Sequence, residues 1–276
     1  MNSVQYLVDA IDAAVRAGQA VLEVYQTDFQ VETKADNSPL TVADQRAHEV
    51  IKSGLKRHGL PSISEEGRHR PYETRRGWPL LWIVDPLDGT KEFVKRNGEF
   101  TVNIALVEGR QPVLGVVYAP VLDCLYFGSK EFGAFKLVGA TQNDFFKQER
   151  ASLEHRFGLL VTAAANLPLV KKSDRSYTVV GSRSHATPEL EQFVERKREE
   201  MGEVEFIAAG SSLKICLVAE GAADVYPRMG PTMEWDTAAG QAVAECAGAR
   251  VYRHDDGTPL IYNKPDLLNP WFVVER

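Results

Sequence analysis

The sequence predicts an α+β / α/β protein with two sub-domains, residues 1–150 and residues 151–276. Two amphipathic helical patterns, followed by several strand patterns with tight turns, favour an α+β unit in the first part. Strand and helix patterns then alternate, which is typical of an α/β unit. Residues 142–172 show weak periodicity, so the boundary is expected inside that stretch. A length of 276 residues suits either one large domain or two packed ones.

The first two elements are predicted to be helices. Apolar residues recur every three or four positions over residues 3–25, which predicts an amphipathic helix. Its polar face is not rich in Lys or Arg, so we expect it to pack on the core rather than on a membrane surface. A second helix is expected over residues 41–58, ended by Gly59. Asp44 falls in its first turn, where the helix dipole favours a carboxylate, and a helix-start acid is the alternative to a functional role.

A short strand is expected over residues 62–64, followed by Glu65 and Glu66. Adjacent side chains on an extended chain point to opposite sides, so at most one of the two glutamates is expected to face an interior site. An acidic pair on the surface is the alternative. Residues 68–78 are predicted to form an exposed polar loop.

The remaining elements follow from apolar runs and turn signals. In the first part we expect a strand over 80–84, a short helix near 91–95, and antiparallel strands over 101–107, 113–118 and 125–128. A long loop with a helical piece is expected between the two parts. In the second part we expect strands over 177–180, 204–207 and 223–226, and helices over 188–201, 211–220 and 236–247.

One apolar run ends in the sequence DPLDGT, which places two carboxylates and a hydroxyl at a strand end. Pro86 and the turn permitted by Gly89 let Asp85 and Asp88 face one point, with Thr90 beside them. Ligands that are all oxygen atoms suit Mg²⁺, which proteins usually hold with a few carboxylates and a substrate phosphate. The motif therefore predicts a magnesium site and phosphate chemistry.

Polar groups also gather at helix starts and strand ends in the second part of the chain. Asp236 opens the helix of an EWDTAAG sequence, where an N-cap acid is the alternative to a metal ligand. Ser211 and Lys214 start another helix and form a potential anion site, although a serine cap and a surface lysine are common. A GSRSH turn at residues 181–185 and Arg228 each follow a strand. Together these groups predict a pocket for a ligand with more than one phosphate.

Composition excludes several classes of function. The formal net charge of −6 disfavours nucleic acid polymers as partners. The chain has no apolar run of about 18 residues and no export pattern at its N-terminus, so a cytoplasmic location without a transmembrane segment is expected. Cys124, Cys216 and Cys246 lie in apolar surroundings without metal-binding spacing, which predicts reduced, buried thiols. The basic clusters within residues 68–76 and 171–172 are interpreted as solvated surface.

The DPLDGT strand end, the later WDTAAG helix start and the upstream Glu65-Glu66 pair together resemble the inositol monophosphatase superfamily. Members of that superfamily are lithium-sensitive, magnesium-dependent phosphatases. The resemblance covers nearly the whole chain. Residues 90–106, 115–120 and 210–228 look most similar to the bacterial 3'(2'),5'-bisphosphate nucleotidases of that superfamily. The resemblance implies a layered αβαβα sandwich with the site between its two sub-domains.

The resemblance also implies roles for individual residues. The Mg²⁺ ligands, for two or three ions, would be Glu65, Asp85, Asp88, Asp236 and the backbone carbonyl of Leu87. Metal ions would activate a water for in-line attack on phosphorus. The catalytic residues would be Asp44, Thr90 and Glu65. Asp44 would accept a hydrogen bond from the Thr90 hydroxyl, so that the pair orients and deprotonates the water.

The substrate follows from the position of Arg228. In inositol monophosphatases the corresponding position looks like a glutamate that accepts hydrogen bonds from a sugar-like diol, whereas an arginine only donates and can bind phosphate bidentately. The implied reaction is hydrolysis of adenosine 3',5'-bisphosphate to AMP and phosphate, a step that clears a by-product of sulfate assimilation. The implied substrate-binding residues are Gly89, Thr90, Ser182, His185, Ser211, Lys214 and Arg228.

Two alternatives remain at this point. One is a phosphatase of the same class that acts on inositol or fructose phosphates. The other is a non-catalytic sensor that binds adenosine bisphosphate without turnover, which the intact carboxylate set and Thr90 disfavour. A monomer is expected, and attachment to the cytoplasmic side of the inner membrane stays open although the sequence shows no anchor.

Overall fold

A computed structural model describes residues 3–27, 31–33, 39–148, 150–170, 175–182 and 187–276. The helices are α1 (Ser3–Tyr25), α2 (Val42–Leu55), α3 (Tyr72–Arg75), α4 (Thr90–Val94), α5 (Leu153–Ala163), α6 (Pro188–Met201), α7 (Leu213–Ala219) and α8 (Glu234–Cys246). The 3-10 turns are η1 (Lys56–His58), η2 (Ala140–Gln142) and η3 (Asp144–Phe146).

The strands form two sheets and a small hairpin. The seven-stranded sheet has the order β3 (Ser62–Ser64), β4 (Leu80–Asp88), β5 (Thr101–Glu108), β6 (Gln111–Ala119), β7 (Cys124–Ser129), β8 (Gly133–Val138) and β9 (Ala165–Asn166). The five-stranded sheet has the order β11 (Val204–Ala208), β10 (Tyr177–Gly181), β12 (Val225–Arg228), β14 (Phe272–Glu275) and β13 (Arg250–Arg253). The hairpin joins β1 (Val31–Thr33) and β2 (Pro39–Thr41).

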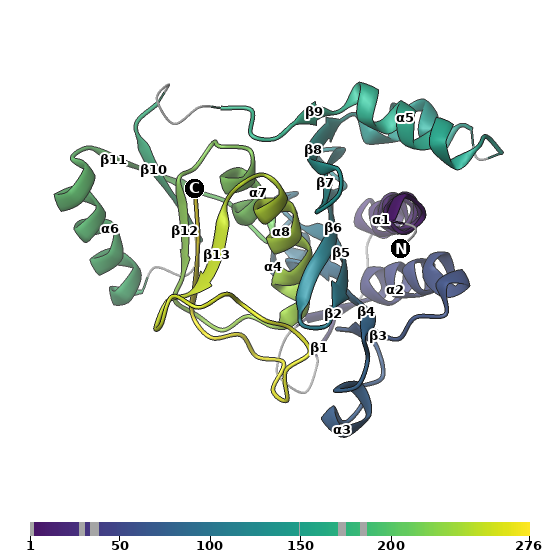
Figure 1. Cartoon of the computed structure of the whole chain (residues 1–276), viewed down its shortest axis with the longest axis horizontal. Coiled ribbons are helices and arrows are strands. Elements are labelled where there is room, and N and C mark those ends of the chain that lie inside the picture. The colour runs from purple at the N-terminus through teal and green to yellow at the C-terminus, as the bar shows by residue number, and fades with distance from the viewer. Residues whose placement is uncertain (1–2, 28–30, 34–38, 149, 171–174, 183–186) are drawn as a thin grey trace.

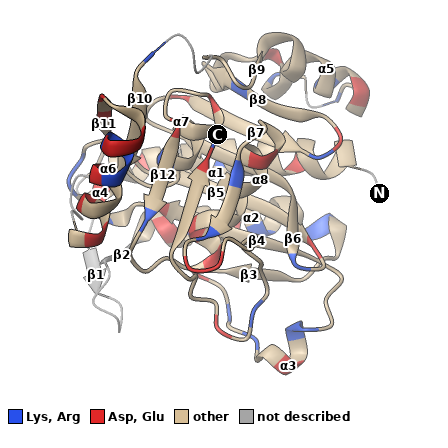
Figure 2. Ribbon diagram, turned by 60° about the vertical axis from the view of Figure 1, so that its left-hand side comes forward, with Lys and Arg blue, Asp and Glu red and all other residues tan. Residues whose placement is uncertain are grey.

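Five layers stack across the molecule (Figure 1). The helix α6 covers the outer face of the smaller sheet, α7 and α8 lie between the two sheets, and α1 and α2 cover the outer face of the larger sheet. Charged residues of both signs lie along α6 (Figure 2), while Leu190 and Val194 of that helix pack against the sheet. The predicted αβαβα sandwich is confirmed.

The strand β4 is buried on both faces, which explains its continuous apolar sequence. Alternate side chains of a strand point to opposite faces of its sheet. Trp82 and Val84 accordingly join the core under α1 and α2, while Leu81 and Ile83 join the core that contains α7 and α8. The strand is therefore held between two hydrophobic cores.

The helix α8 lies unusually close to the strand β6. A Cβ atom on Gly115 would lie 2.2 Å from the carbonyl oxygen of Ala239, and one on Gly240 would lie 2.9 Å from the Cδ1 atom of Ile215 in α7. The small residues of the Ala-Ala-Gly sequence in α8 therefore allow this close packing. Because Asp236 lies in the first turn of α8, this packing also places its carboxylate.

The strand β4 continues to Asp88 rather than ending at residue 84 as predicted. Its pairing with β5 continues from Asp85 opposite Asn103 to Asp88 opposite Thr101, with an irregularity between them. Pro86 is accommodated at this irregularity, where a ladder hydrogen bond is not required.

The segment after residue 150 belongs with the larger sheet. Residues of α5 pack on the core under α1, and β9 pairs with β8. We propose that the division between the sub-domains follows Asn166 rather than residue 150.

One expectation about the surface needs revision. Arg75 is buried, and its guanidinium donates to the side chain of Asn263 at 2.8 Å and to the carbonyl of Pro265 at 2.9 Å. The interpretation of this arginine as solvated is wrong, because the short helix α3 turns it toward the C-terminal segment. The other basic cluster, Lys171-Lys172, lies outside the described residues.

No helix in the described ranges combines the length and apolar character needed to cross a membrane.

Candidate active site

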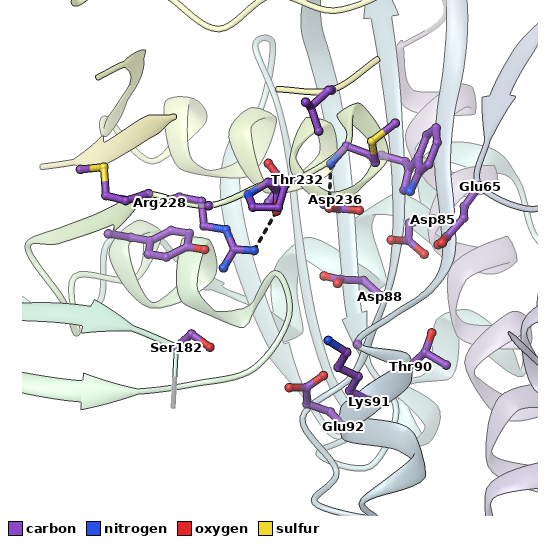
Figure 3. A pocket seen from close by; sticks show the side chains of 18 of the residues that line it. Glu65, Asp85, Asp88, Thr90, Lys91, Glu92, Ser182, Arg228, Thr232 and Asp236 are labelled. Atoms are coloured by element: carbon purple, nitrogen blue, oxygen red, sulfur yellow. Dashed lines mark hydrogen bonds between the residues drawn. The ribbon is translucent and has the colours of Figure 1, made fainter. Parts of the chain in front are cut away.

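A cavity of about 580 Å³ lies where β4, β12 and the start of α8 meet (Figure 3). A smaller space of about 120 Å³ adjoins it and shares some of its lining. The sequence-predicted residues that line the larger space are Glu65, Asp85, Leu87, Asp88, Gly89, Thr90, Ser182, Arg228 and Asp236. Ser211 and Lys214 line the smaller one. His185 lies outside the described residues.

Asp85 is the central acid of the site. It is 1% exposed, and its Oδ1 atom accepts a hydrogen bond from the backbone N–H of Leu87 at 3.1 Å. Burial raises the pKa of Asp85 well above its usual value, and the charges of Glu65, Asp88 and Asp236 raise this pKa further. Acids from several parts of the chain therefore act on one buried carboxylate.

Asp88 is held by one of its two oxygens. Its Oδ2 atom accepts from the backbone N–H of Ser212 at 2.7 Å and from the Ser212 hydroxyl at 2.9 Å. The same oxygen accepts from Asn103 at 3.3 Å and from Thr101 at 3.4 Å. Because these donors lie on one side, the other oxygen is left for the cavity. Sequence reasoning did not place Ser212, Asn103 or Thr101 beside Asp88, since only the pairing of β4 with β5 and the contact with α7 bring them together.

Asp236 does not begin its helix, contrary to the N-cap reading. The helix α8 begins at Glu234 after the N-cap residue Met233, and Asp236 is the third helical residue. Its Oδ2 atom accepts from the backbone N–H of Met233 at 2.9 Å, as an acid at that position often does. The pKa of Asp236 is raised to about 8. Burial is the largest cause, and the negative charge of Asp88 is the second. The carboxylate therefore both caps the helix and faces the other acids.

Asp44, Glu65 and Glu66 form a second acidic group, whose carboxylate oxygens lie within 4.8 Å of one another. Glu65 lines the larger cavity and Glu66 is not among its lining residues, in keeping with the expectation of one inward-facing glutamate, but both approach Asp44. The chain is not extended there, because the N–H of Gly67 donates to the carbonyl of Ser64 at 3.0 Å and closes a turn. Both glutamates therefore reach the buried Asp44 of α2. Such a set of oxygen ligands suits a hard divalent cation.

Thr90 begins α4, directly after Gly89. Its hydroxyl donates to the backbone carbonyl of Leu87 at 3.4 Å, so the hydrogen bond expected from Thr90 to Asp44 is not formed in this structure. Gly89 has a φ of +94°, and a Cβ atom there would lie 2.5 Å from the hydroxyl oxygen of Ser211. Only a glycine permits both that backbone conformation and that contact between the two halves.

The basic side of the site is formed by Lys214 and Arg228. Lys214 is buried, donates to the carbonyl of Ala209 at 3.3 Å, and lies over the ring of Tyr226. Burial lowers the pKa of Lys214 to about 8. The guanidinium of Arg228 donates to the carbonyl of Pro231 at 2.9 Å and lies across the cavity from the acids (Figure 3).

Ser211 does not begin a helix, which differs from the prediction. The helix α7 begins at Leu213, and Ser211 occupies a turn with a φ of +45°. Its hydroxyl donates to the backbone carbonyl of Glu99 at 2.5 Å. The serine therefore joins the two halves beside the smaller space that it lines.

We expect Ser212→Ala to weaken Mg²⁺ binding by about 10- to 100-fold, the range found when a residue that orients a metal ligand is removed. The variant loses the hydroxyl that holds Asp88, while the backbone N–H contact remains. Titration calorimetry with Mg²⁺ measures the change. Ser53→Ala, on the exposed side of α2, is the matched control and should bind as the parent does. Equal affinities for the two variants would contradict the role of Ser212.

The fold and this site together define a phosphatase class. The model of the inositol monophosphatase family matches residues 3–272, so the chain belongs to that family. It is 46% identical to the 3'(2'),5'-bisphosphate nucleotidase CysQ of Shigella flexneri, over 95% of this chain and 96% of that protein. It is 34% identical to the protein of the same name in Haemophilus influenzae, over 95% of this chain and 89% of that protein.

Solved structures agree with this assignment. The crystal structure of CysQ from Bacteroides thetaiotaomicron, described as a bacterial member of the inositol monophosphatase family, matches with a TM-score of 0.87. It is 50% identical, over 98% of this chain and 97% of that chain. The Thermotoga maritima IMPase matches with a TM-score of 0.71 at 20% identity, over 100% of this chain and 92% of that chain, which shows a shared fold alone.

Proposed function

We propose that this protein is a Mg²⁺-dependent 3'(2'),5'-bisphosphate nucleotidase that converts adenosine 3',5'-bisphosphate to AMP and phosphate. The observation that carries the proposal is the cavity in which acids from both halves of the chain face Arg228 (Figure 3). The relatives named CysQ support the same activity. In a cell the reaction would clear a by-product of sulfate assimilation.

The acids of the cavity would hold the metal ions. We assign Glu65, Asp85, Asp88, Asp236 and the carbonyl of Leu87 as ligands for two or three Mg²⁺ ions. Bound Mg²⁺ would lower the pKa of a coordinated water and neutralise charge on the phosphate oxygens. The oxygen-only donor set, and the raised pKa of the buried Asp85 among its acidic neighbours, both favour a cation at this place.

The protein groups would position the water and the phosphate. We assign Thr90 and Asp44 to orient the attacking water and take its proton, with Glu65 beside them. A threonine hydroxyl rotates about a single bond, so it is free to leave its 3.4 Å contact with the carbonyl of Leu87. Glu66, which joins the same acidic group, is a further candidate that the sequence did not predict.

The basic groups would hold the rest of the nucleotide. Arg228 lines both spaces, Lys214 lines the smaller one, and both supply positive charge; Ser182 also lines both spaces. We propose that they bind the 5'-phosphate and the ribose while the 3'-phosphate faces the acids. Gly89, Ser211 and His185 complete the proposed substrate-binding set.

We expect Arg228→Ala to raise the KM for adenosine 3',5'-bisphosphate by about 10- to 100-fold, because a charge-assisted hydrogen bond to phosphate is lost. The kcat should change less. Steady-state kinetics measure both constants, and Arg253→Ala, at an exposed arginine paired with Asp255, is the control. A clear increase in kcat/KM for inositol 1-phosphate in Arg228→Glu would support the proposed role of Arg228 in substrate choice. An unchanged KM in Arg228→Ala would contradict that role.

The KM is expected to rise as the pH increases through about 8. Burial lowers the pKa of Lys214 to about 8, so its ammonium group is present below that pH and is lost above it. Only the charged form attracts the substrate phosphate. Kinetics between pH 6.5 and pH 9.5 test this, and Lys214→Met should give a high KM that does not depend on pH. If the KM of Lys214→Met rose with pH by the same factor as that of the parent, another group would be responsible for the titration.

Phosphate release from three substrates tests the proposal most simply. Adenosine 3',5'-bisphosphate, inositol 1-phosphate and fructose 1,6-bisphosphate are compared with matched Mg²⁺ concentrations. We expect a strong preference for the first, and a preference for either sugar phosphate would support the alternative phosphatase. Tight binding of adenosine 3',5'-bisphosphate without phosphate release would support the sensor. The monomeric state and the cytoplasmic location stay predictions, which light scattering and fractionation can check.

A further inference from the structure

The first turn of α8 is held by residues 263–269, which are called the 263–269 segment below and have no role in the proposed reaction. The backbone N–H of Glu234 donates to the carbonyl of Leu267 in this segment at 2.9 Å. Asp236 is the third residue of the helix, so its carboxylate moves with that turn. Contacts that fix the turn therefore also fix a proposed metal ligand.

Glu234 is a fully buried acid at the start of this turn, and donors of the 263–269 segment satisfy both of its oxygens. Its Oε2 atom accepts from the backbone N–H of Asn263 at 2.6 Å. Its Oε1 atom accepts from the backbone N–H of Lys264 at 2.9 Å and from the Nζ atom of the same lysine at 2.6 Å. A charge removed from water requires such partners, so the carboxylate fixes the segment against α8.

Lys264 extends this contact toward Asp236 through further hydrogen bonds. Its ammonium group also donates to the Oδ1 atom of Asn269 at 3.3 Å. The Nδ2 atom of Asn269 donates to the carbonyl of Met233 at 2.8 Å. The backbone N–H of Met233 in turn donates to the Oδ2 atom of Asp236. A continuous chain of hydrogen bonds therefore runs from Glu234 to the carboxylate of Asp236.

The 263–269 segment is itself fixed from its other side. Asn263 has a φ of +56°, and its side chain is paired with the buried Arg75. The guanidinium donates to the Oδ1 atom of Asn263 at 2.8 Å, and the Nδ2 atom of Asn263 donates to the carbonyl of Arg75 at 2.7 Å. The segment is therefore tied to α3 and does not simply follow α8.

We propose that Glu234 and Lys264 are positioning residues of the metal site, which hold Asp236 in place for a divalent cation. The inference rests on the proposed role of Asp236 as a metal ligand. A buried ion pair adds little to the free energy of unfolding, because desolvation offsets the attraction between its charges. Residues that orient a metal ligand, in contrast, have a large effect on metal affinity. The main effect of the pair is therefore on the position of Asp236.

Titration calorimetry of the full chain with Mg²⁺, well below the melting temperature, tests the proposal in Lys264→Met. We expect the dissociation constant to rise about tenfold, the lower end of the range for supporting residues, because Lys264 acts through intervening groups. The matched control is Lys136→Met on β8, which breaks a similarly buried ion pair with Glu220. It should lower the melting temperature without changing the affinity. Unchanged affinity in Lys264→Met, or an equal loss in Lys136→Met, would overturn the proposal.

The double variant Glu234→Gln/Lys264→Met separates positioning from stability, and it is the variant to measure if Lys264→Met does not fold. Lys264→Met alone leaves a buried carboxylate without its ammonium partner, whereas the double variant leaves no unpaired charge. The double variant should therefore melt at a higher temperature than Lys264→Met while its Mg²⁺ affinity stays reduced. An affinity equal to that of the parent would show that the pair affects stability alone.

Hydrogen exchange of the metal-free protein gives a readout that does not depend on the nucleotidase proposal. The amide of Met233 is protected by its hydrogen bond to Asp236. It should exchange about tenfold faster in Lys264→Met and at the parent rate in Lys136→Met. A parent that binds no Mg²⁺ would refute the proposed function, and the exchange would still decide whether the pair positions Asp236. An unchanged exchange rate of Met233 in Lys264→Met would refute the positioning role.

Discussion

Asp85→Asn should lower kcat by about 10³-fold or more while the protein without metal stays folded. The substitution removes one negative charge from a buried group of acids, so bound cations lose a ligand and the phosphate loses part of its charge neutralisation. That neutralisation contributes several kcal/mol to a metal-dependent reaction, and each 1.36 kcal/mol is a factor of ten in rate. The asparagine oxygen can keep the hydrogen bond from the N–H of Leu87.

Stability measurements distinguish this result from simple unfolding. Because burial and neighbouring charges disfavour the ionised Asp85, the metal-free variant should melt at the same temperature as the parent or higher. The rise in melting temperature caused by added Mg²⁺ should shrink, since the variant binds the ion less tightly. Asp144→Asn, at an exposed residue paired with Lys147, should behave as the parent in both tests. Full activity in Asp85→Asn would refute the proposed metal site.

Gly115→Ala should destabilise the protein by about 1–3 kcal/mol and also reduce its activity. The added Cβ atom would lie 2.2 Å from the carbonyl oxygen of Ala239 and 2.8 Å from the Cβ atom of Ala242. Both neighbours belong to α8, and a helix backbone cannot give way as a flexible side chain can. The helix must therefore shift away from β6, and Asp236 in its first turn shifts with it.

Thermal unfolding and kinetics measure the two effects together. For a chain of this size, each kcal/mol corresponds to about 2–4 °C in melting temperature. The control is Gly158→Ala in α5, where an added Cβ atom has no neighbour within 4 Å and alanine is the better helix former. That variant should be slightly more stable and fully active. A parent-like melting temperature for Gly115→Ala would show that α8 is not held as the structure describes.

The fold was predictable where the sequence pattern is local. The periodic apolar positions of α1 and the proline at the start of α6 gave the bounds that the structure has, at residues 3–25 and 188–201. The strands β8, β13 and β14 were missed. They have at most six residues, and β13 and β14 pair with partners that only the folded chain supplies. Sequence periodicity carries little information over such short lengths.

The site was predictable at the residues that stand in motifs, and not at those that support them. Asp85, Asp88 and Asp236 were selected by sequence, and the structure brings them to one cavity. The contact between Ser212 and Asn103 was not predicted, because it spans 109 positions of the chain. The rule that neighbouring side chains of an extended chain point apart does not apply to Glu65 and Glu66, because the turn closed by Gly67 lets both approach Asp44.

Anomalous diffraction from crystals soaked with Mn²⁺, a substitute for Mg²⁺, tests the central claim most directly. We expect peaks in contact with Asp85, Asp88 and Asp236, so that residues from both halves of the chain share the bound ions. The same crystals of Asp85→Asn should show the peaks weakened or absent. Strong peaks elsewhere on the protein, with none among these three carboxylates, would contradict the account.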